Sequence, residues 1–283
     1  DFKTNNLHVV GYSESINKHM TFEELSPRLH VLEGLPEAVP YRTSYYTRSW
    51  GFCVNTRQYK SLQQAEGQLE VVIDSEFDAN GSMSIGELLI PGERSDEYLI
   101  STYICHPSMA NDNLSGIITS ALLAKHILGS GKPQYSWRFV FIPETIGAIA
   151  YLYYNEGNIV RVKGGFIVSC CGGQGALGYK ESYLGDSLVD RAIQLAFRDR
   201  SIEAIRYPFS PLGSDERQYS SPGFRIPVST ICKDKYYEYD YYHTSLDDLE
   251  FVKGRYICES LHFYQQAVNR IDGDIVFRNR YPN

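Results

Sequence analysis

The sequence lacks any run of eighteen apolar residues, and it lacks a short apolar segment of the signal-peptide kind. A helix that crosses a bilayer needs about twenty consecutive, mostly apolar residues. We therefore expect no membrane span and no membrane partner. The chain also opens on Asp1 without a methionine, so we expect it to be a fragment of a longer protein.

Positive charge is scarce. The 283 residues include 27 Lys and Arg against 34 Asp and Glu, which gives a formal net charge of -7. Proteins that bind nucleic acid neutralise phosphates with clustered Lys and Arg, and the sequence shows no such cluster. We therefore expect no nucleic-acid partner for this segment.

Paired cysteine spacing is also missing. No two of the six cysteines are separated by two residues, and several lie in apolar runs, where small buried thiols are common. A reduced, cytoplasmic protein is the simplest interpretation.

An apolar content of 43% with 22% charged residues is typical of a globular protein with a substantial core. Residues 1–90 consist of short strand-like pieces separated by turn signals such as "DANGS" and "PGERSD". They predict a small β-rich module with one helix at "TFEELSPRL", where Thr21 and Glu24 match a capping box.

Residues 91–283 alternate apolar strands with helical patterns. Strands are expected at 98–104, 137–142, 165–170 and 226–231, and helices at 113–129, 147–155, 186–199 and 252–270. Apolar strands between amphipathic helices are typical of a mostly parallel or mixed sheet with helices on both faces. We predict an α/β domain over 91–283.

Polar residues follow the ends of these strands, where α/β sheets bind their ligands. His106 follows the first strand, Glu144 follows the second, and Cys170 ends the third. The side chains of His106, Asp112 and His243 are ligand types that suit Zn²⁺ in an open catalytic site. Glu144 is then the candidate base for a zinc-activated water.

Each of these residues also has a structural interpretation. A lone histidine after a strand or in a loop is more often a turn, core or solvated residue, which applies to His106 and His243. Asp112 and Glu144 could each cap the helix that follows. The metal interpretation therefore depends on the residues acting together.

Four segments, in this order, strengthen the joint interpretation: "ANDNLSG" (110–116), "PETIGAIAYL" (143–152), "GSDERQYSSPGFRIP" (213–227) and "YYHTSLDDL" (241–249). They resemble the A-D-D-N-x-S-G, E-E-x-G-L-x-G-S, S-D-H-x-x-F…G-I-P and H-T-x-x-D motifs of the zinc aminopeptidases. The sequence is most similar to bacterial aminopeptidase-like proteins associated with polysaccharide-biosynthesis loci. Those proteins carry an inserted domain of unknown function and a C-terminal winged helix.

The resemblance implies a zinc exopeptidase-like fold of the phosphorylase/hydrolase-like type, with residues 1–90 as part of the insert. It implies a zinc cofactor, Asp112 as a metal ligand and Glu144 as the general base. The implied substrate is a peptide or an N-acylated small molecule. The sequence does not indicate an oligomeric state.

Two departures from the pattern bear on the number of metal ions. Thr145 stands where the two-metal enzymes have a second glutamate ligand, and Cys170 stands where the resemblance leads us to expect a metal-binding aspartate. Relative to the pattern of the two-metal enzymes, both changes remove carboxylates that a second dication would need. We therefore predict one zinc ion, and thiolate ligation by Cys170 stays open as an alternative to a buried neutral thiol.

The segment "SDER" places Asp215, Glu216 and Arg217 beside the predicted site. A carboxylate there could bind a substrate ammonium, and Arg217 could bind a carboxylate or phosphate. The alternative is a surface ion-pair cluster. Asp247, four residues after His243, is a candidate for orienting a ligand imidazole.

We therefore expect a zinc-dependent, aminopeptidase-like hydrolase of amide bonds. Two alternatives remain: a single-zinc enzyme of another type on the same fold, namely an acyl-transfer or cyclising enzyme or an N-acyl-sugar amidohydrolase, and a catalytically silent binding module.

Overall fold

The computed structural model describes residues 7–273, which fall into two compact units. Among these residues, the small unit comprises 7–82, His106–Ala110 and Asp240–Phe251. The sheet unit comprises Met83–Cys105, Asn111–Tyr239 and 252–273. Both units are therefore discontinuous in the sequence.

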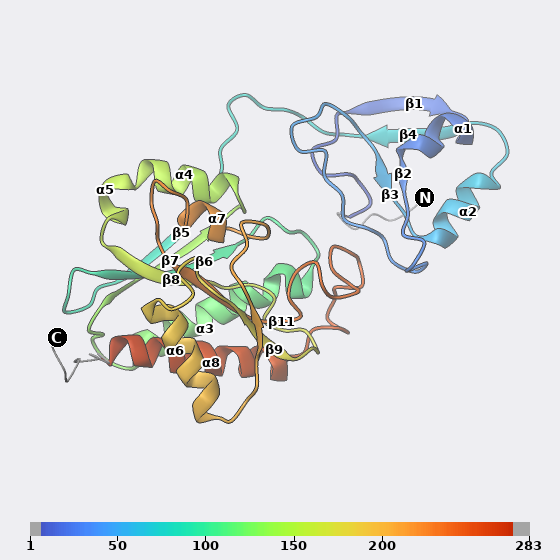
Figure 1. Ribbon diagram of the computed structural model, residues 1–283. Coiled ribbons are helices and arrows are strands. Elements are labelled where there is room, and N and C mark those ends of the chain that lie inside the picture. Colours follow the sequence, from blue (N-terminus) through green and yellow to red (C-terminus); the bar gives the residue numbers. More distant parts are fainter. Residues whose placement is uncertain (1–6, 274–283) are drawn as a thin grey trace. The chain divides into compact units, whose positions relative to one another are not determined.

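The sheet unit is built on a seven-stranded mixed sheet with the order β10-β9-β11-β8-β6-β7-β5 (Figure 1). Its strands are β5 (Gly86–Ile90), β6 (Glu97–Tyr103), β7 (Ser136–Ile142), β8 (Val162–Ile167), β9 (Leu177–Lys180), β10 (Ile205–Tyr207) and β11 (Val228–Lys233). Strands β11, β8, β6 and β7 run parallel, whereas β5 is antiparallel to β7 and β9 is antiparallel to β11. The predicted α/β class with a mostly parallel or mixed sheet is confirmed.

Helices cover both faces of this sheet, as the sequence predicted (Figure 1). One face carries α3 (Gly116–Gly129), α6 (Leu188–Asp199) and α8 (Gly254–Asp272), and the other carries α4 (Ile146–Tyr154), α5 (Glu156–Ile159) and α7 (Glu216–Tyr219). None of the helices among residues 7–273 is both long enough and apolar enough to cross a membrane.

Strand β6 shows why the two faces have separate cores. All seven of its residues are buried, because helices cover both faces. Side chains alternate along a strand, so Tyr98 and Ile100 join the core beneath α3, α6 and α8, while Leu99 joins the core beneath α4.

The small unit contains two short sheets, β1 with β4 and β2 with β3. Its elements are β1 (Ile16–Met20), α1 (Phe22–Leu25), the 3-10 turn η1 (Ser26–Arg28), β2 (Leu29–His30), β3 (Phe52–Cys53), α2 (Thr56–Gln63) and β4 (Leu69–Ile73). The capping box of Thr21 and Glu24 is confirmed at α1. Helix α2 was not predicted, although Asn55 and Gln58 form a second capping box at its start.

The boundary between the units differs from the prediction. It lies after Ser82 and not after residue 90, because residues 86–90 form β5, which pairs with β7 at the edge of the large sheet. The predicted assignment of 91–283 to a single domain also differs, since His106–Ala110 and Asp240–Phe251 group with the small unit.

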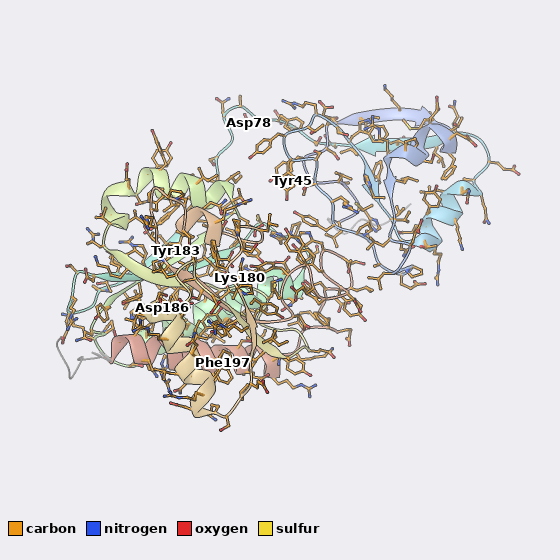
Figure 2. The ribbon with its side chains drawn as sticks, viewed as in Figure 1. Tyr45, Asp78, Lys180, Tyr183, Asp186 and Phe197 are labelled. Atoms are coloured by element: carbon orange, nitrogen blue, oxygen red, sulfur yellow. The ribbon has the colours of Figure 1, made fainter. Side chains whose placement is uncertain are left out.

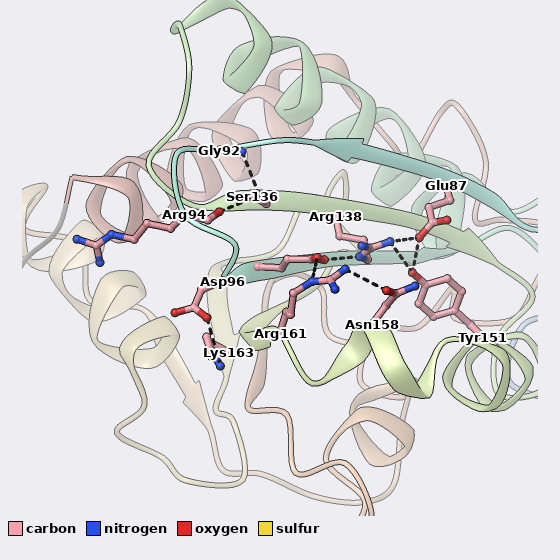
Figure 3. A network of polar contacts seen from close by, with 11 residues as sticks. Glu87, Gly92, Arg94, Asp96, Ser136, Arg138, Tyr151, Asn158, Arg161 and Lys163 are labelled. Atoms are coloured by element: carbon pink, nitrogen blue, oxygen red, sulfur yellow. Dashed lines mark hydrogen bonds and ion pairs between the residues drawn. The ribbon is translucent and has the colours of Figure 1, made fainter.

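An ion-pair network centred on the buried Arg138 and Glu97 ties the edge strand β5 to the sheet and to α4 (Figure 3). Arg138 Nε donates to Glu97 Oε2 at 2.5 Å, and Arg161 Nε donates to Glu97 Oε1 at 2.8 Å. Arg138 also pairs with Glu87 of β5, to which the Tyr151 hydroxyl of α4 donates at 2.5 Å. Burial by itself raises the pKa of Glu97, but the hydrogen bonds and charges of the two arginines outweigh it, so this pKa is lowered.

We predict that Arg138→Met lowers the free energy of unfolding by about 3 kcal/mol, because it leaves Glu97 buried with one arginine partner fewer. Urea unfolding measures the effect. Lys163→Met is the matched control, since Lys163 pairs with Asp96 at 3.4 Å in a half-exposed position, and it should change stability by less than about 0.5 kcal/mol. Equal losses of stability in the two variants would contradict the larger contribution of the buried ion pair between Arg138 and Glu97.

The lowered pKa of Glu97 also makes the folding stability of the protein depend on pH. Its ion pairs contribute fully above the carboxyl's pKa in the unfolded chain, about 4.3, and the contribution is lost as pH falls through the lower folded-state value. The stability difference between the native protein and Arg138→Met should therefore shrink in acid.

Candidate metal centre

Two of the predicted ligands, His106 and His243, lie together in the small unit. Their ring centroids are 5.2 Å apart, and both side chains are half-buried. The ring of Tyr41 lies 5.7 Å from His106 and meets His243 edge-on at 5.0 Å. The Tyr242 ring stacks on His243 at 3.9 Å. His243 is thus packed among aromatic rings, which differs from the solvated loop histidine of the structural interpretation.

Residues of the N-terminal segment fix the position of His243. The Tyr41 N–H donates to the His243 carbonyl at 2.7 Å. The Ser245 N–H donates to the Val39 carbonyl at 2.9 Å, and the Val39 N–H donates to Ser245 Oγ at 2.9 Å. The contact of Tyr41 with the two histidines was not predicted, because one tyrosine in a tyrosine-rich segment carries no distinguishing signal.

A further backbone bond joins the two loops that carry the histidines. The Ala110 N–H donates to the Asp247 carbonyl at 2.8 Å. Asp247 is fully buried in the small unit. Its predicted role in orienting a ligand imidazole stays a prediction.

Asp112, the third predicted ligand, belongs to the sheet unit and is 1% exposed. It lies in the turn η2 (Ala110–Ser115), and its Oδ1 accepts a hydrogen bond from the Tyr103 hydroxyl. Helix α3 begins at Gly116 with Ser115 as its N-cap and without a side-chain capping bond. Asp112 therefore does not occupy the N-cap position of α3 that the capping interpretation gave it.

The neighbours of Asp112 hold its turn against the sheet. Asn113 Nδ2 donates to Thr102 Oγ1 and to the Tyr103 carbonyl, both at 2.9 Å. On the other side, Asn111 Oδ1 accepts from the Gly172 N–H at 2.8 Å. The backbone around the carboxylate is thus fixed from both sides.

Glu144 follows β7 at the carboxyl end of the sheet, as predicted, and is half-buried. Its N–H donates to Cys105 Sγ at 3.1 Å. Helix α4 begins at Ile146 with Thr145 as its N-cap, and the Thr145 side chain makes no capping hydrogen bond. Glu144 therefore precedes the N-cap position, and its role as a base stays a prediction.

The surroundings of Cys105 and Tyr103 are rich in carboxylates. Burial raises the pKa of Cys105 to about 12, and the charges of Glu144, Asp215 and Asp112 add to the increase. Burial also raises the pKa of Tyr103, with Asp112 as the next cause. Both groups therefore stay neutral at pH 7, and the local negative charge favours a cation.

Asp215 and Glu216 are each 1% exposed, so the surface ion-pair interpretation was wrong for both. Asp215 Oδ1 accepts from the Thr145 N–H at 2.7 Å, and burial raises the pKa of Asp215 to about 7. Arg217 is exposed, and its Nη2 donates to Thr145 Oγ1 at 3.4 Å. Binding of a substrate by these residues stays a prediction.

Glu216 is engaged by groups of the protein itself. Its Oε1 accepts from Thr230 Oγ1 at 3.0 Å and from the Tyr236 hydroxyl at 3.1 Å. Lys180, buried within the sheet unit (Figure 2), donates to the Tyr236 hydroxyl at 2.8 Å and lies 3.7 Å from Glu216 Oε1. These contacts make Glu216 an anchor for the loop that carries Asp215.

Cys170 lies three residues beyond the end of β8 and is fully buried. The predicted strand 165–170 therefore ends earlier, at Ile167. The Cys170 carbonyl accepts from the Lys233 N–H at 2.8 Å, which ties this turn to β11. Ligation by its thiol stays an open alternative.

Comparisons with known proteins agree with this fold. A family model described as "Domain of unknown function (DUF4910)" matches residues 25–274. A Clostridium acetobutylicum protein named "Putative polysaccharide biosynthesis protein with aminopeptidase-like domain" is 40% identical over 282 residues, which cover 100% of this chain and 64% of that protein. The chain thus spans slightly less than two thirds of the relative's length.

Solved structures give the same result. The crystal structure of a "putative peptidase" from Clostridium acetobutylicum matches with a TM-score of 0.91 at 40% identity, covering 96% of this chain and 63% of that one. A zinc aminopeptidase from Bacillus subtilis matches with a TM-score of 0.64 at 16% identity, covering 92% and 68%. The second match shows a shared fold. The predicted resemblance to aminopeptidase-like proteins is confirmed.

We predict that Tyr103→Phe destabilises the metal-free protein by about 1–3 kcal/mol, because it removes the hydroxyl donor from the buried Asp112 side chain. Urea unfolding after dialysis against a chelator measures the loss. Tyr154→Phe, at a position 81% exposed, is the matched control and should have no effect. An unchanged stability of Tyr103→Phe would contradict a stabilising role of this hydrogen bond.

Proposed function

Because this chain belongs to the DUF4910 family and shares its fold with zinc aminopeptidases, we propose that it is a zinc-dependent hydrolase of amide bonds. One observation carries the proposal. His106, Asp112 and His243 form a group of potential ligands that could hold a metal ion. The aminopeptidase-like domain named in the relative from Clostridium acetobutylicum supports the same reaction class.

The donor set fits zinc. Catalytic zinc sites use three protein ligands of imidazole or carboxylate type and keep a fourth position open. The ring centroids of His106 and His243 are 5.2 Å apart, and zinc binds nitrogen at about 2.0–2.1 Å, so one ion can reach a nitrogen of each ring. Asp112 would add the negative charge.

A bound zinc ion supplies Lewis-acid chemistry, which polarises a substrate carbonyl and makes a water molecule easier to deprotonate. Glu144 would take the proton from that water and later deliver it to the leaving nitrogen. The Cys105 thiol holds the Glu144 backbone, and its raised pKa keeps it from competing as a nucleophile at neutral pH.

We propose a single ion. Thr145 offers no carboxylate at the position of the second glutamate, and its N–H and hydroxyl already contact Asp215 and Arg217. Cys170 is not a member of the group of potential ligands found among the described residues.

A second candidate function is the hydrolysis of an N-acylated sugar. The polysaccharide biosynthesis named in the relative favours it, because amide-bearing sugars are common building blocks of polysaccharides. A panel of amino-acyl 4-nitroanilides and N-acetylated hexosamines separates the two functions. Turnover of the anilides alone supports the aminopeptidase, and release of acetate alone supports the sugar amidohydrolase.

We predict one tightly bound zinc per chain, measured by elemental analysis after saturation with zinc and removal of the excess. His243→Ala should lose the ion, because it removes one of three ligands. His126→Ala is the matched control, since that imidazole contacts Asn269 at 3.0 Å on the surface, and it should keep the ion. Two tightly held ions in the native protein would contradict the proposal.

We predict that Glu144→Gln lowers turnover by about 100-fold while zinc stays bound, because glutamine keeps the shape but cannot accept the proton. Glu156→Gln, at an exposed position on α5, is the matched control and should keep full turnover. An active, zinc-loaded Glu144→Gln protein would exclude this mechanism, and loss of zinc would identify Glu144 as a ligand.

A further inference from the structure

The backbone next to Glu144 is in an unusual conformation. Thr145 has φ +62° and ψ −70°, values that match the centre of a classic γ-turn, which is rare and strained. The defining hydrogen bond is present, because the Ile146 N–H donates to the Glu144 carbonyl at 2.7 Å. A β-branched residue at positive φ is an outlier that persists only when its surroundings hold it.

Asp215 is the group that holds this turn. Its Oδ1 accepts from the Thr145 N–H at 2.7 Å, and Arg217 adds a weaker, exposed contact to Thr145 Oγ1 at 3.4 Å. Asp215 Oδ2 is buried and has no hydrogen-bond partner among the described residues. Burying half of a carboxylate without a partner is unfavourable, so stability alone does not explain this aspartate.

Contacts with two strands of the sheet hold the backbone of Asp215 in place. The Asp215 carbonyl accepts from the N–H of Tyr219 at 3.2 Å, at the first turn of α7. The Tyr219 hydroxyl contacts Ser101 Oγ of β6 at 3.0 Å. The next residue, Glu216, is anchored to Thr230 of β11. Two strands of the sheet therefore fix the acceptor that faces Thr145.

From these contacts we infer that Asp215 is a positioning residue, which holds Thr145 in the strained turn and thereby aims the Glu144 carboxylate. Glu144 is fixed on both sides: its N–H donates to Cys105 Sγ, and its carbonyl and the following N–H are held by Ile146 and Asp215. Without Asp215, Thr145 relaxes to negative φ and Glu144 turns away. The inference rests on the proposed role of Glu144 as the base.

The first test measures the strain without using activity. Thr145→Gly and Thr145→Ala both lose the contact with Arg217, but only glycine adopts positive φ freely. With Asp215 present, the glycine variant should have the higher urea midpoint. In the Asp215→Ala background the order should reverse, because alanine is the more stable of the two in ordinary backbone. If the glycine and alanine variants have the same order of urea midpoints in both backgrounds, the inference that Asp215 holds Thr145 at positive φ is overturned.

The second test measures turnover of leucine 4-nitroanilide, or of N-acetylglucosamine if that is the substrate hydrolysed. Asp215→Ala should lower kcat by about 10- to 100-fold, because small misplacements of a catalytic group are costly, while KM and zinc content stay unchanged. Asp186→Ala is the matched control, since Asp186 has an exposed side chain and pairs with Arg191. The Asp186→Ala variant should have the kcat, KM and zinc content of the native protein.

The conservative variant separates positioning from a charge-dependent role. Asp215→Asn keeps an oxygen that accepts from the Thr145 N–H, so it should recover most of the turnover lost in Asp215→Ala. An asparagine variant as slow as the alanine variant would overturn positioning and indicate a role for the carboxylate charge or proton. A native protein that hydrolyses no substrate overturns the proposed function, whereas the midpoint order still decides whether Asp215 holds the turn.

Discussion

The complete burial of β6 is the constraint on which the rest of the structure depends. A strand covered on both faces cannot shift its register without moving apolar side chains between two separate cores. Its end is therefore a fixed reference point, and Tyr103, Cys105 and His106 follow one another there. Tyr103 contacts Asp112, and Cys105 contacts the backbone of Glu144. The positions of two predicted site residues thus derive from one strand.

Much of this arrangement could be predicted from the sequence because it depends on periodicity and short motifs. Apolar strands between amphipathic helices indicated the layers of the sheet unit, and the four segments indicated the candidate site residues, of which Asp112, Glu144 and Asp215 belong to the sheet unit. The edge strand β5 was misassigned because only its last residue is buried. A strand with such weak apolar patterning resembles the short strands of the small unit.

Other features depend on tertiary contacts that leave no local signal. The γ-turn at Thr145 requires the distant acceptor Asp215, and a threonine gives no indication of positive φ. The packing of Tyr41 against His243 joins residues about two hundred positions apart. Nor could the sequence show that Asp215 and Glu216 are buried, since acidic residues are mostly found on protein surfaces.

The discontinuity of the small unit has a consequence for biosynthesis. Domains generally fold in the order in which the ribosome releases them. The small unit contains both the N-terminal segment and Asp240–Phe251, so the contact between Tyr41 and His243 can form only after most of the sheet unit, but not its helix α8, has been synthesised. The two histidines therefore acquire their aromatic surroundings only after residues 111–239 of the sheet unit have been synthesised. A nascent chain would carry the carboxyl groups of Asp112 and Glu144 before it could complete this histidine pair.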